Sequence, residues 1–194
     1  NEHLSKLAES IETWNAWRQE QPDIRPDLSS VNFRGADLGG VNFSDANLSD
    51  AKLRDVNLKE ANLKKADLRE ADLSGADLTR AELGGAYLYR ADLIGTRLIG
   101  ANLNEANIID ATLIGADLRG ADLSSADIRQ ANLMNADLSD VTGLECESLQ
   151  RASNWQLATR TPELDCGEPR RPQDDEATAK MVSTQNPAAE PTSE

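Results

Sequence analysis

The residues with the clearest potential for chemistry are carboxylates that recur at a fixed spacing. Residues 31–140 form 22 successive five-residue units, and the second position of the unit is Asp or Glu in 10 of them and Asn in 8. Carboxylate oxygens held at regular intervals can bind metal ions. They can equally form a solvated face in which Asn amides hydrogen-bond to their neighbours. The fold that stacks the units decides between these two roles.

Other groups that support catalysis are scarce in the sequence. The single histidine, His3, lies at the N-terminus, where we expect an exposed surface residue. The sequence contains no glycine-rich phosphate loop and no nucleophile motif. Cys146 and Cys166 have no histidine partner and therefore make a poor metal site. We expect a protein that is not an enzyme and that uses no cofactor or metal.

The composition argues against two further classes of protein. A net charge of −14 does not favour direct binding of nucleic acid or of anionic lipid through a basic surface. No apolar run approaches the roughly 20 residues that span a bilayer, so we expect no membrane insertion.

A five-residue period must position the carboxylates. Leu, Phe or Ile stands at every fifth position from Leu28 to Leu138, and from residue 31 onward Ala, Val or Thr stands two residues earlier. Steps of five advance about 140° around an α-helix and alternate between the faces of a straight strand. One buried face is therefore possible only if the chain turns in every unit. The fifth position is Gly, Asn or Asp in 14 of 22 units, which suits a turn.

Units such as ADLSG (71–75), ADLTR (76–80) and ADLRG (116–120) follow the pattern A-[D/N]-L-x-x and resemble the pentapeptide-repeat family. The resemblance implies an all-β solenoid, a right-handed quadrilateral β-helix with four units per coil and therefore about 5.5 coils. Residues twenty apart would then stack about 4.8 Å from one another. Stacked carboxylates repel at that distance, so we expect a solvated face with amide ladders at the second position.

Each end of such a solenoid exposes apolar core and needs a cover. Residues 2–20 are predicted to form one helix whose apolar stripe packs on the first coil, where two phenylalanines face each other. The residues predicted to form this N-terminal packing are Leu4, Leu7, Ile11, Trp14, Phe33 and Phe43. A helix that binds a partner is the alternative for the stripe, and a ligand pocket is the alternative for the wide first coil.

The register of the repeat fails after residue 142. Thr142 and Glu145 match a capping box, which predicts a helix from about 143 to 158. A second, short helix is predicted to begin at Thr161-Pro162-Glu163. This layout resembles C-terminal caps of some bacterial family members in which such cysteines pair, so we favour a disulfide between Cys146 and Cys166. Two free thiols, or a redox or metal role, are the alternatives.

The sequence thus divides into four segments. We expect an N-terminal capping helix and linker at 1–27, the β-helix at 28–142, a helical cap at 143–167 and a disordered tail at 168–194. We expect the cytoplasm rather than the periplasm or a lumen, because no secretory signal is visible at the start of the sequence, although a disulfide would favour the latter compartments.

Several outward-facing positions hold apolar residues where most units are polar. They are Tyr87, Tyr89, Ile94, Ile99, Ile109 and Ile114. Under twenty-residue stacking, Ile109 lies over Tyr89 and Ile114 lies over Ile94. A contiguous exposed apolar patch usually marks an interface. The alternative is that Tyr and Ile merely suit an extended backbone.

We therefore predict a protein-interaction or structural scaffold whose partner is an unknown protein or a second copy of the chain. The alternative is a mimic of DNA that binds DNA gyrase, because the resemblance includes quinolone-resistance members of the family. Residues 31–140 carry 18 acidic and 12 basic residues, a net charge of −6. Duplex DNA of the expected length, about 26 Å, carries about 15 charges, which disfavours the mimic.

Overall fold

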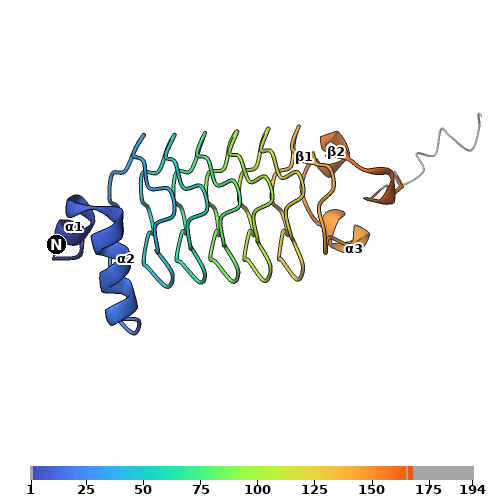
Figure 1. Ribbon diagram of the computed structural model, residues 1–194. Coiled ribbons are helices and arrows are strands. Elements are labelled where there is room, and N and C mark those ends of the chain that lie inside the picture. The colour runs from blue at the N-terminus through green and yellow to red at the C-terminus, as the bar shows by residue number, and fades with distance from the viewer. Residues whose placement is uncertain (1, 165, 168–194) are drawn as a thin grey trace, which may run out of the picture.

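The computed structural model describes residues 2–164 and 166–167. The chain forms a rod of stacked coils, with two helices at its N-terminal end and short elements at its C-terminal end (Figure 1). The tail expected at 168–194 lies outside the described residues. Within the described part of the chain, no helix is long and apolar enough to cross a membrane.

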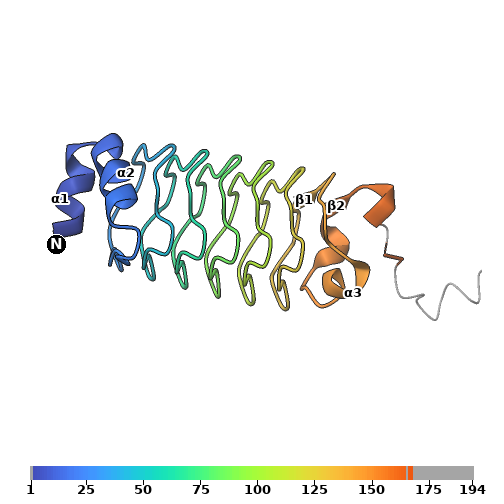
Figure 2. The same cartoon turned by 60° about the horizontal axis from the view of Figure 1, so that its bottom comes forward.

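Each coil of the rod takes twenty residues. Parallel backbone bridges join residues twenty apart, from Asp27 with Asn47 to Asp122 with Thr142. Twenty residues are four of the five-residue units, and the coils follow one another side by side along the rod in both views (Figure 2). The protein is thus a β-helical solenoid in which the same position of every fourth unit stacks.

The first and third residues of each unit form the core of the rod. Ala71 and Leu73 have no exposed surface, and most equivalent residues in the other units are similarly buried. The N–H of Ala71 donates to the Leu68 carbonyl at 3.2 Å and closes a turn over the two residues between them. Every fifth position from Ser30 to Asp140 has a φ between 55° and 68°. A positive φ at the third residue of a turn is the signature of type II, so the predicted turn in every unit is confirmed.

The second residue of the unit fixes the corner through a local hydrogen bond. The Asp92 carboxylate accepts the Ile94 N–H at 3.0 Å, and most Asp and Asn residues at this position do the same two residues ahead. The predicted amide ladders are also present: the Asn57 amide donates to Asp37 at 2.6 Å. Asp and Asn recur here because their short side chains satisfy a backbone donor that the turn leaves open.

Two helices, α1 (Glu2–Glu9) and α2 (Ile11–Glu20), lie at the N-terminal end of the rod. The prediction of one helix over residues 2–20 is wrong because Ser10 breaks it. Ser10 has extended backbone angles, and its hydroxyl accepts the Thr13 N–H at 3.1 Å. A serine bonded in this way caps a new helix rather than continuing the old one.

Aromatic residues fill the junction between α2 and the first coil. Trp14 is fully buried, and its indole N–H donates to the Asn42 carbonyl at 2.8 Å. The Phe33 and Phe43 rings are stacked with centroids 6.2 Å apart, and the edge of Trp14 meets Phe43 at 5.5 Å. The remaining apolar residues of the predicted stripe are partly buried against this core: Leu4, Leu7 and Ile11.

The C-terminal end contains α3 (Cys146–Leu149), two 3-10 helices (Trp155–Leu157 and Pro162–Leu164) and the parallel strand pair β1 (Asp137–Leu138) and β2 (Thr159–Arg160). The prediction of a helix from 143 to 158 is therefore wrong, whereas the predicted short helix near Pro162 is present as a 3-10 turn. Thr142 does not cap a helix: its N–H donates to the Ala121 carbonyl at 2.9 Å and continues the last column of the solenoid.

The segment after α3 hydrogen-bonds to the last coil as a further repeat would, although its sequence lacks the repeat pattern. The Leu133 N–H donates to the Ser153 carbonyl at 2.9 Å, and the Thr159 N–H donates to the Ala136 carbonyl at 2.9 Å. These bonds cover backbone groups that the last coil would otherwise expose, which is how natural solenoids protect their edges. The Cys146–Cys166 disulfide, with Cα atoms 5.2 Å apart, ties α3 to the segment that follows Pro162–Leu164. The predicted pairing of the two cysteines is confirmed.

Candidate protein-interaction surface

The six apolar residues singled out from the sequence, which we call the apolar surface, all lie on the outside of the rod. Tyr87 is 47% exposed and Ile94 is 43% exposed, whereas the others are half-buried. The Gly95 N–H donates to the Ile114 carbonyl at 2.9 Å, which places Ile94 and Ile114 at the same corner of consecutive coils. The Gly115 N–H makes the same bond, at 2.9 Å, to Met134 one coil further. Three apolar side chains therefore follow one edge of the rod.

Glycines leave the space beside this edge open. Gly95 and Gly115 occupy the fifth positions after Ile94 and Ile114, with φ of +63° and +64°. A Cβ added to either glycine would meet no atom within 4 Å. The isoleucine side chains therefore stand next to bare backbone, and another chain can approach closely there. The sequence shows this signal as the repeated Ile-Gly pair, whose importance becomes clear only when the two pairs are seen to stack.

The tyrosines of the apolar surface lie among charged groups. Tyr87 pairs with Asp67 in the parallel ladder, and a shallow hollow is lined by Arg25, Asp67, Arg69 and Tyr87. The Arg90 guanidinium lies 4.9 Å from the centre of the Tyr89 ring, a cation–π distance. This side of the apolar surface therefore offers aromatic faces next to arginines, a combination that is enriched at protein interfaces.

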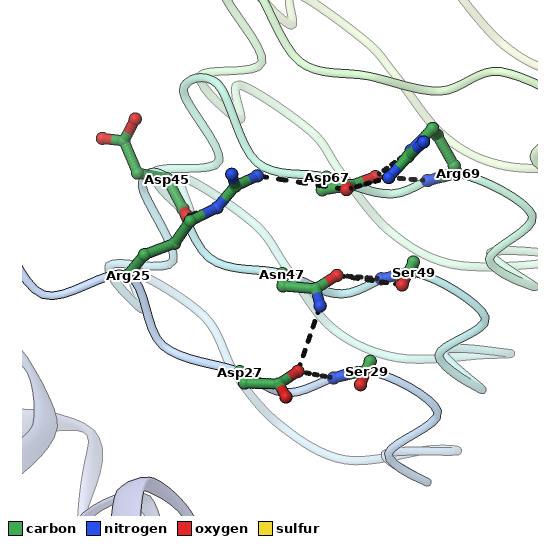
Figure 3. A network of polar contacts seen from close by, with 8 residues as sticks. All are labelled: Arg25, Asp27, Ser29, Asp45, Asn47, Ser49, Asp67 and Arg69. Carbon is green, nitrogen blue, oxygen red and sulfur yellow. Dashed lines mark hydrogen bonds and ion pairs between the residues drawn. The ribbon is translucent and has the colours of Figure 1, made fainter.

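Asp67, which pairs with Tyr87 in the ladder, is a buried carboxylate held by arginines on both sides (Figure 3). Its two oxygens accept both Nε and Nη2 of Arg69 at 2.7 Å, and Nη2 of Arg25 lies 3.9 Å away. The hydrogen bond from the Arg69 side chain, which outweighs burial of the carboxylate, lowers the pKa of Asp67. Arg25 also donates to the Asp45 carbonyl at 3.0 Å. The network ties the linker after α2 to the repeats, and its carboxylate is ionised at neutral pH.

Several other second-position carboxylates pair with basic side chains, whereas Asp72 and Asp122 are bonded by the serine two residues ahead. Asp77 lies 3.3 Å from the Lys59 ammonium and 3.2 Å from the Arg97 guanidinium. Arg119 bonds Asp117 at 2.7 Å, and Arg129 bonds Asp127 at 2.6 Å. In the described ranges, no group of three or more His, Cys, Asp or Glu residues is placed to hold a metal ion.

His3 differs from its expected place. The sequence predicts an exposed residue at a frayed end, but His3 is half-buried with its ring 5.4 Å from the ring of Trp17. Lys6 and Arg18 also lie over the Trp17 ring, at 5.8 and 5.7 Å from its centre. The histidine therefore belongs to the packing between α1 and α2, which the sequence alone does not reveal.

The twenty-residue ladder, the inward Ala and Leu residues and the turn in every unit define a tandem-repeat solenoid. The chain belongs to the pentapeptide-repeat family: the family model described as Pentapeptide repeats matches residues 27–64, 66–104 and 101–140, with eight copies. A comparison with curated proteins found no match.

Solved structures of three pentapeptide-repeat proteins are similar to this chain. HetL, involved in the regulation of heterocyst differentiation in the cyanobacterium Nostoc sp. strain PCC 7120, is 32% identical over 65% of this chain and 68% of its own, with a TM-score of 0.48. A protein of the Arabidopsis thaliana thylakoid lumen is 27% identical over 63% and 76%, with a TM-score of 0.47. QnrB1, a plasmid-mediated fluoroquinolone resistance protein, is 21% identical over 80% and 87%, with a TM-score of 0.46.

Proposed function

We propose that this protein is a non-enzymatic scaffold that binds another protein through the apolar surface. The observation that carries the proposal is the edge formed by Ile94, Ile114 and Met134 on consecutive coils, together with the exposed Tyr87 in the unit that precedes Ile94. A solenoid does not need these residues for its core, because Leu88, Leu93 and Leu98 fill the interior of the same units. Apolar groups that the core does not need and that gather on one surface typically mark a binding site.

The chemistry of the surface supports binding. Interfaces are enriched in Tyr, Met and Arg and are depleted of charge at their centre. Here Tyr89 stacks with Ile109, and Ile94 stacks with Ile114. Arg90 and Arg97 lie on the same coil as Tyr89 and Ile94. The acidic side chain of Asp92, between Tyr89 and Ile94 in the chain, is held by a hydrogen bond from the Ile94 N–H.

The finer architecture is part of the same proposal. We infer a right-handed quadrilateral β-helix of about 5.5 coils, the four-sided form expected when four units complete each twenty-residue period. The helices α1 and α2 act as the N-terminal cap, and residues 143–167 act as the C-terminal cap. Trp14, buried against Phe43, supports the first assignment, and the strand pair β1–β2 supports the second.

The proposal is tested by replacing the apolar side chains without disturbing the core. A triple variant, Tyr89→Ser, Ile94→Ser and Ile114→Ser, should lose the partners that the wild-type chain captures from an extract of the source organism, as measured by quantitative mass spectrometry. It should keep the wild-type melting temperature, because the changed residues point outward.

The matched control changes the opposite side of the rod. Lys64→Ser with Asn104→Ser alters two outward residues on coils of the same region, and this variant should capture the same proteins as the wild type. Equal capture by the triple variant and the wild type would overturn the proposed function.

A further inference from the structure

We propose that the apolar surface pairs with a second copy of this chain, with the two rods running antiparallel around the midpoint between Ile94 and Ile114. This inference rests on the proposed function and names its partner. The evidence for it is the order in which second-position side chains follow one another along the side of the rod that includes Ile94. On this side the second-position residues form a single parallel column: Asn32, Lys52, Asp72, Asp92, Thr112, Asn132 and Ser153.

This column is complementary in charge and hydrogen bonding to the same column of a second copy that runs in the opposite direction. When two copies of this side meet antiparallel, with Ile94 opposite Ile114 of the other copy, Asp92 faces Thr112. One coil further out, Asp72 faces Asn132, and one coil beyond that Lys52 faces Ser153, while the neutral Asn32 extends past the last residue of the other copy's column. Every carboxylate then meets a hydroxyl or amide that can donate a hydrogen bond to it, and no residue meets a like charge.

The parallel arrangement of the same two surfaces is unfavourable. A two-fold axis along the rod would bring each second-position residue opposite its own copy, so that Asp72 would face Asp72, Asp92 would face Asp92 and Lys52 would face Lys52. Like charges placed directly opposite one another destabilise a pairing. Charge therefore selects one orientation of the dimer.

The apolar edge fits the same orientation. A two-fold axis across the rod keeps the corner of one copy opposite the same corner of the other, so Ile94 meets Ile114 twice and Met134 meets the small Ser74. Ser74 is buried, with its N–H and hydroxyl both bonded to Asp72, so it adds no bulk at this point. The open space beside Gly95 and Gly115 allows the isoleucines of the second copy to approach the backbone. An interface of this kind is isologous and closes as a dimer.

The first test measures the mass of the purified full chain over a range of concentrations by light scattering and sedimentation. We expect a dimer whose dissociation constant rises at least about tenfold in the Ile94→Ser, Ile114→Ser double variant, because two central contacts are lost in each copy. The Lys64→Ser, Asn104→Ser variant should dimerise as the wild type does. Thermal melting monitored by circular dichroism checks that the variants remain folded.

The second test reads the orientation of the pair. Lys52→Cys and Ser153→Cys place thiols on exposed residues that would face each other in the antiparallel pair, and the native cysteines are already joined to each other. A short bismaleimide should cross-link a mixture of the two variants but neither variant alone. Cross-linking of the Lys52→Cys variant with itself would show a parallel dimer and overturn the inference.

The outcomes separate this inference from the proposed function. A monomer at all concentrations overturns the self-pairing, and the proposed function stands if the triple variant still loses captured proteins. A dimer that the Ile94→Ser, Ile114→Ser variant leaves unchanged also overturns the self-pairing. Equal capture of every protein other than the chain itself by wild type and triple variant, with a dimer that cross-links between residues 52 and 153, would leave only the second copy as partner.

Discussion

At the scale of single residues, Asp67 shows how one repeat position acquires a specific role. Most second-position carboxylates accept one backbone N–H, and Asp67, like Asp117 and Asp127, also receives bonds from the arginine two residues ahead. Asp67 differs in that Arg25, from the linker after α2, also lies 3.9 Å away. Its side chain is only 8% exposed, so the charge is supported mainly by these partners. Charge-assisted bonds of this kind are about twice as strong as neutral ones. The pKa of Asp67 is lower in the folded chain for this reason.

Replacing Asp67 with Asn should lower stability in a pH-dependent manner. The pKa of Asp67 is depressed by folding, so its carboxylate stabilises the fold above the unfolded value of about 4. That contribution is lost as the pH falls through the lower, folded-state pKa. Asp67→Asn should therefore lower the free energy of unfolding by about 2 kcal/mol near pH 6. The difference in stability between variant and wild type should become smaller as the pH is lowered toward about 2. Thermal unfolding at both pH values measures it.

Asp92→Asn is the matched control for this prediction. Asp92 accepts the Ile94 N–H, and an Asn side chain can accept the same bond. Its effect on stability near pH 6 should therefore be small. A constant gap between the wild type and Asp67→Asn across the same range would show that the ionised carboxylate does not stabilise the network.

The fifth position carries a backbone cost that glycine removes. Glu105 has a φ of +57° and Gly120 a φ of +65°. The left-handed region costs a residue with a Cβ roughly 1–2 kcal/mol, partly offset by the greater entropy that glycine loses on folding. Glu105→Gly should therefore stabilise the chain by about 0.5 kcal/mol, and Gly120→Ala, where the new Cβ meets nothing, should destabilise it by about the same or more. Urea unfolding of both variants tests the sign, and a stabilising Gly120→Ala would contradict the argument.

The amino-acid pattern reveals some of these residue roles but not others. Asp or Asn at the second position and Gly, Asn or Asp at the fifth follow from the demands of a turn, so both could be anticipated. The Asp67 network could not, because Arg25 lies 42 positions earlier in the chain (67 − 25 = 42) and reaches Asp67 only after the linker has folded along the first coils. His3 was misplaced for the same reason, since its partner Trp17 lies on another helix.

At the scale of elements, the alternation of inward and outward residues defines the unit. Leu93 is 1% exposed and Ile94 is 43% exposed, although they are neighbours in sequence. A charge at Leu93 would have to enter an interior built mainly of Ala and Leu, where the buried Thr96 hydroxyl is already bonded to the Leu73 carbonyl, and this costs far more than the lost apolar contact. Leu93 and Ile94 are therefore a suitable pair for testing whether the third residue of the unit faces the core.

Leu93→Asp should destabilise the fold by roughly 4 kcal/mol or more, whereas Ile94→Asp should change stability by less than about 0.5 kcal/mol. Denaturant unfolding followed by circular dichroism compares the two variants in one experiment. Similar midpoints for Leu93→Asp and the wild type would show that Leu93 does not face the core.

Period five predicted the repeated element correctly because the pattern is local and occurs 22 times. The two ends of the rod are less predictable because the sequence of each end occurs only once and offers no repeated pattern. Ser10 interrupts an apolar stripe that continues through it, so the stripe alone suggested one helix. Thr142 and Glu145 match a capping box, but Thr142 is still held by the solenoid ladder through Ala121. Tertiary hydrogen bonds thus override a local helix signal at this junction.

The disulfide should stabilise the C-terminal end. Cys146 and Cys166 are 20 residues apart, and closing a loop of that size contributes roughly 3 kcal/mol in the chain-entropy model. Cys146→Ser with Cys166→Ser should therefore lower the stability of the region around α3 by up to that amount. Hydrogen exchange should show faster exchange at residues 146–160 with little change in residues 51–120.

Thiol titration of the denatured wild-type chain accompanies this prediction. It should detect no free thiol without reductant and two after reduction. A double serine variant whose C-terminal exchange matches that of the wild type would show that the ladder bonds to residues 153 and 159 are sufficient to hold this end.

At the scale of the whole molecule, the rod is acidic but its charge is not that of a nucleic acid. The chain carries −14 overall, and residues 31–140 carry −6. In the structure several of the acidic groups are paired with basic side chains: Asp77 lies between Lys59 and Arg97, and Arg119 contacts both Asp117 and Asp137. A DNA duplex presents unpaired phosphates instead, one charge per 1.7 Å or so. The apolar edge further distinguishes this surface from that of DNA.

We therefore expect no competition with DNA for a DNA-binding enzyme. Supercoiling by purified DNA gyrase should proceed at the same rate with and without the chain at micromolar concentration, because electrostatic mimicry requires a dense uniform field and this rod alternates acidic with basic groups. Gyrase supercoiling followed by agarose electrophoresis measures the effect, with a duplex DNA competitor as the positive control. Inhibition that weakens steeply with added salt would show that the acidic columns act as a phosphate surrogate, and would shift the binding surface from the apolar edge to the charged sides of the rod.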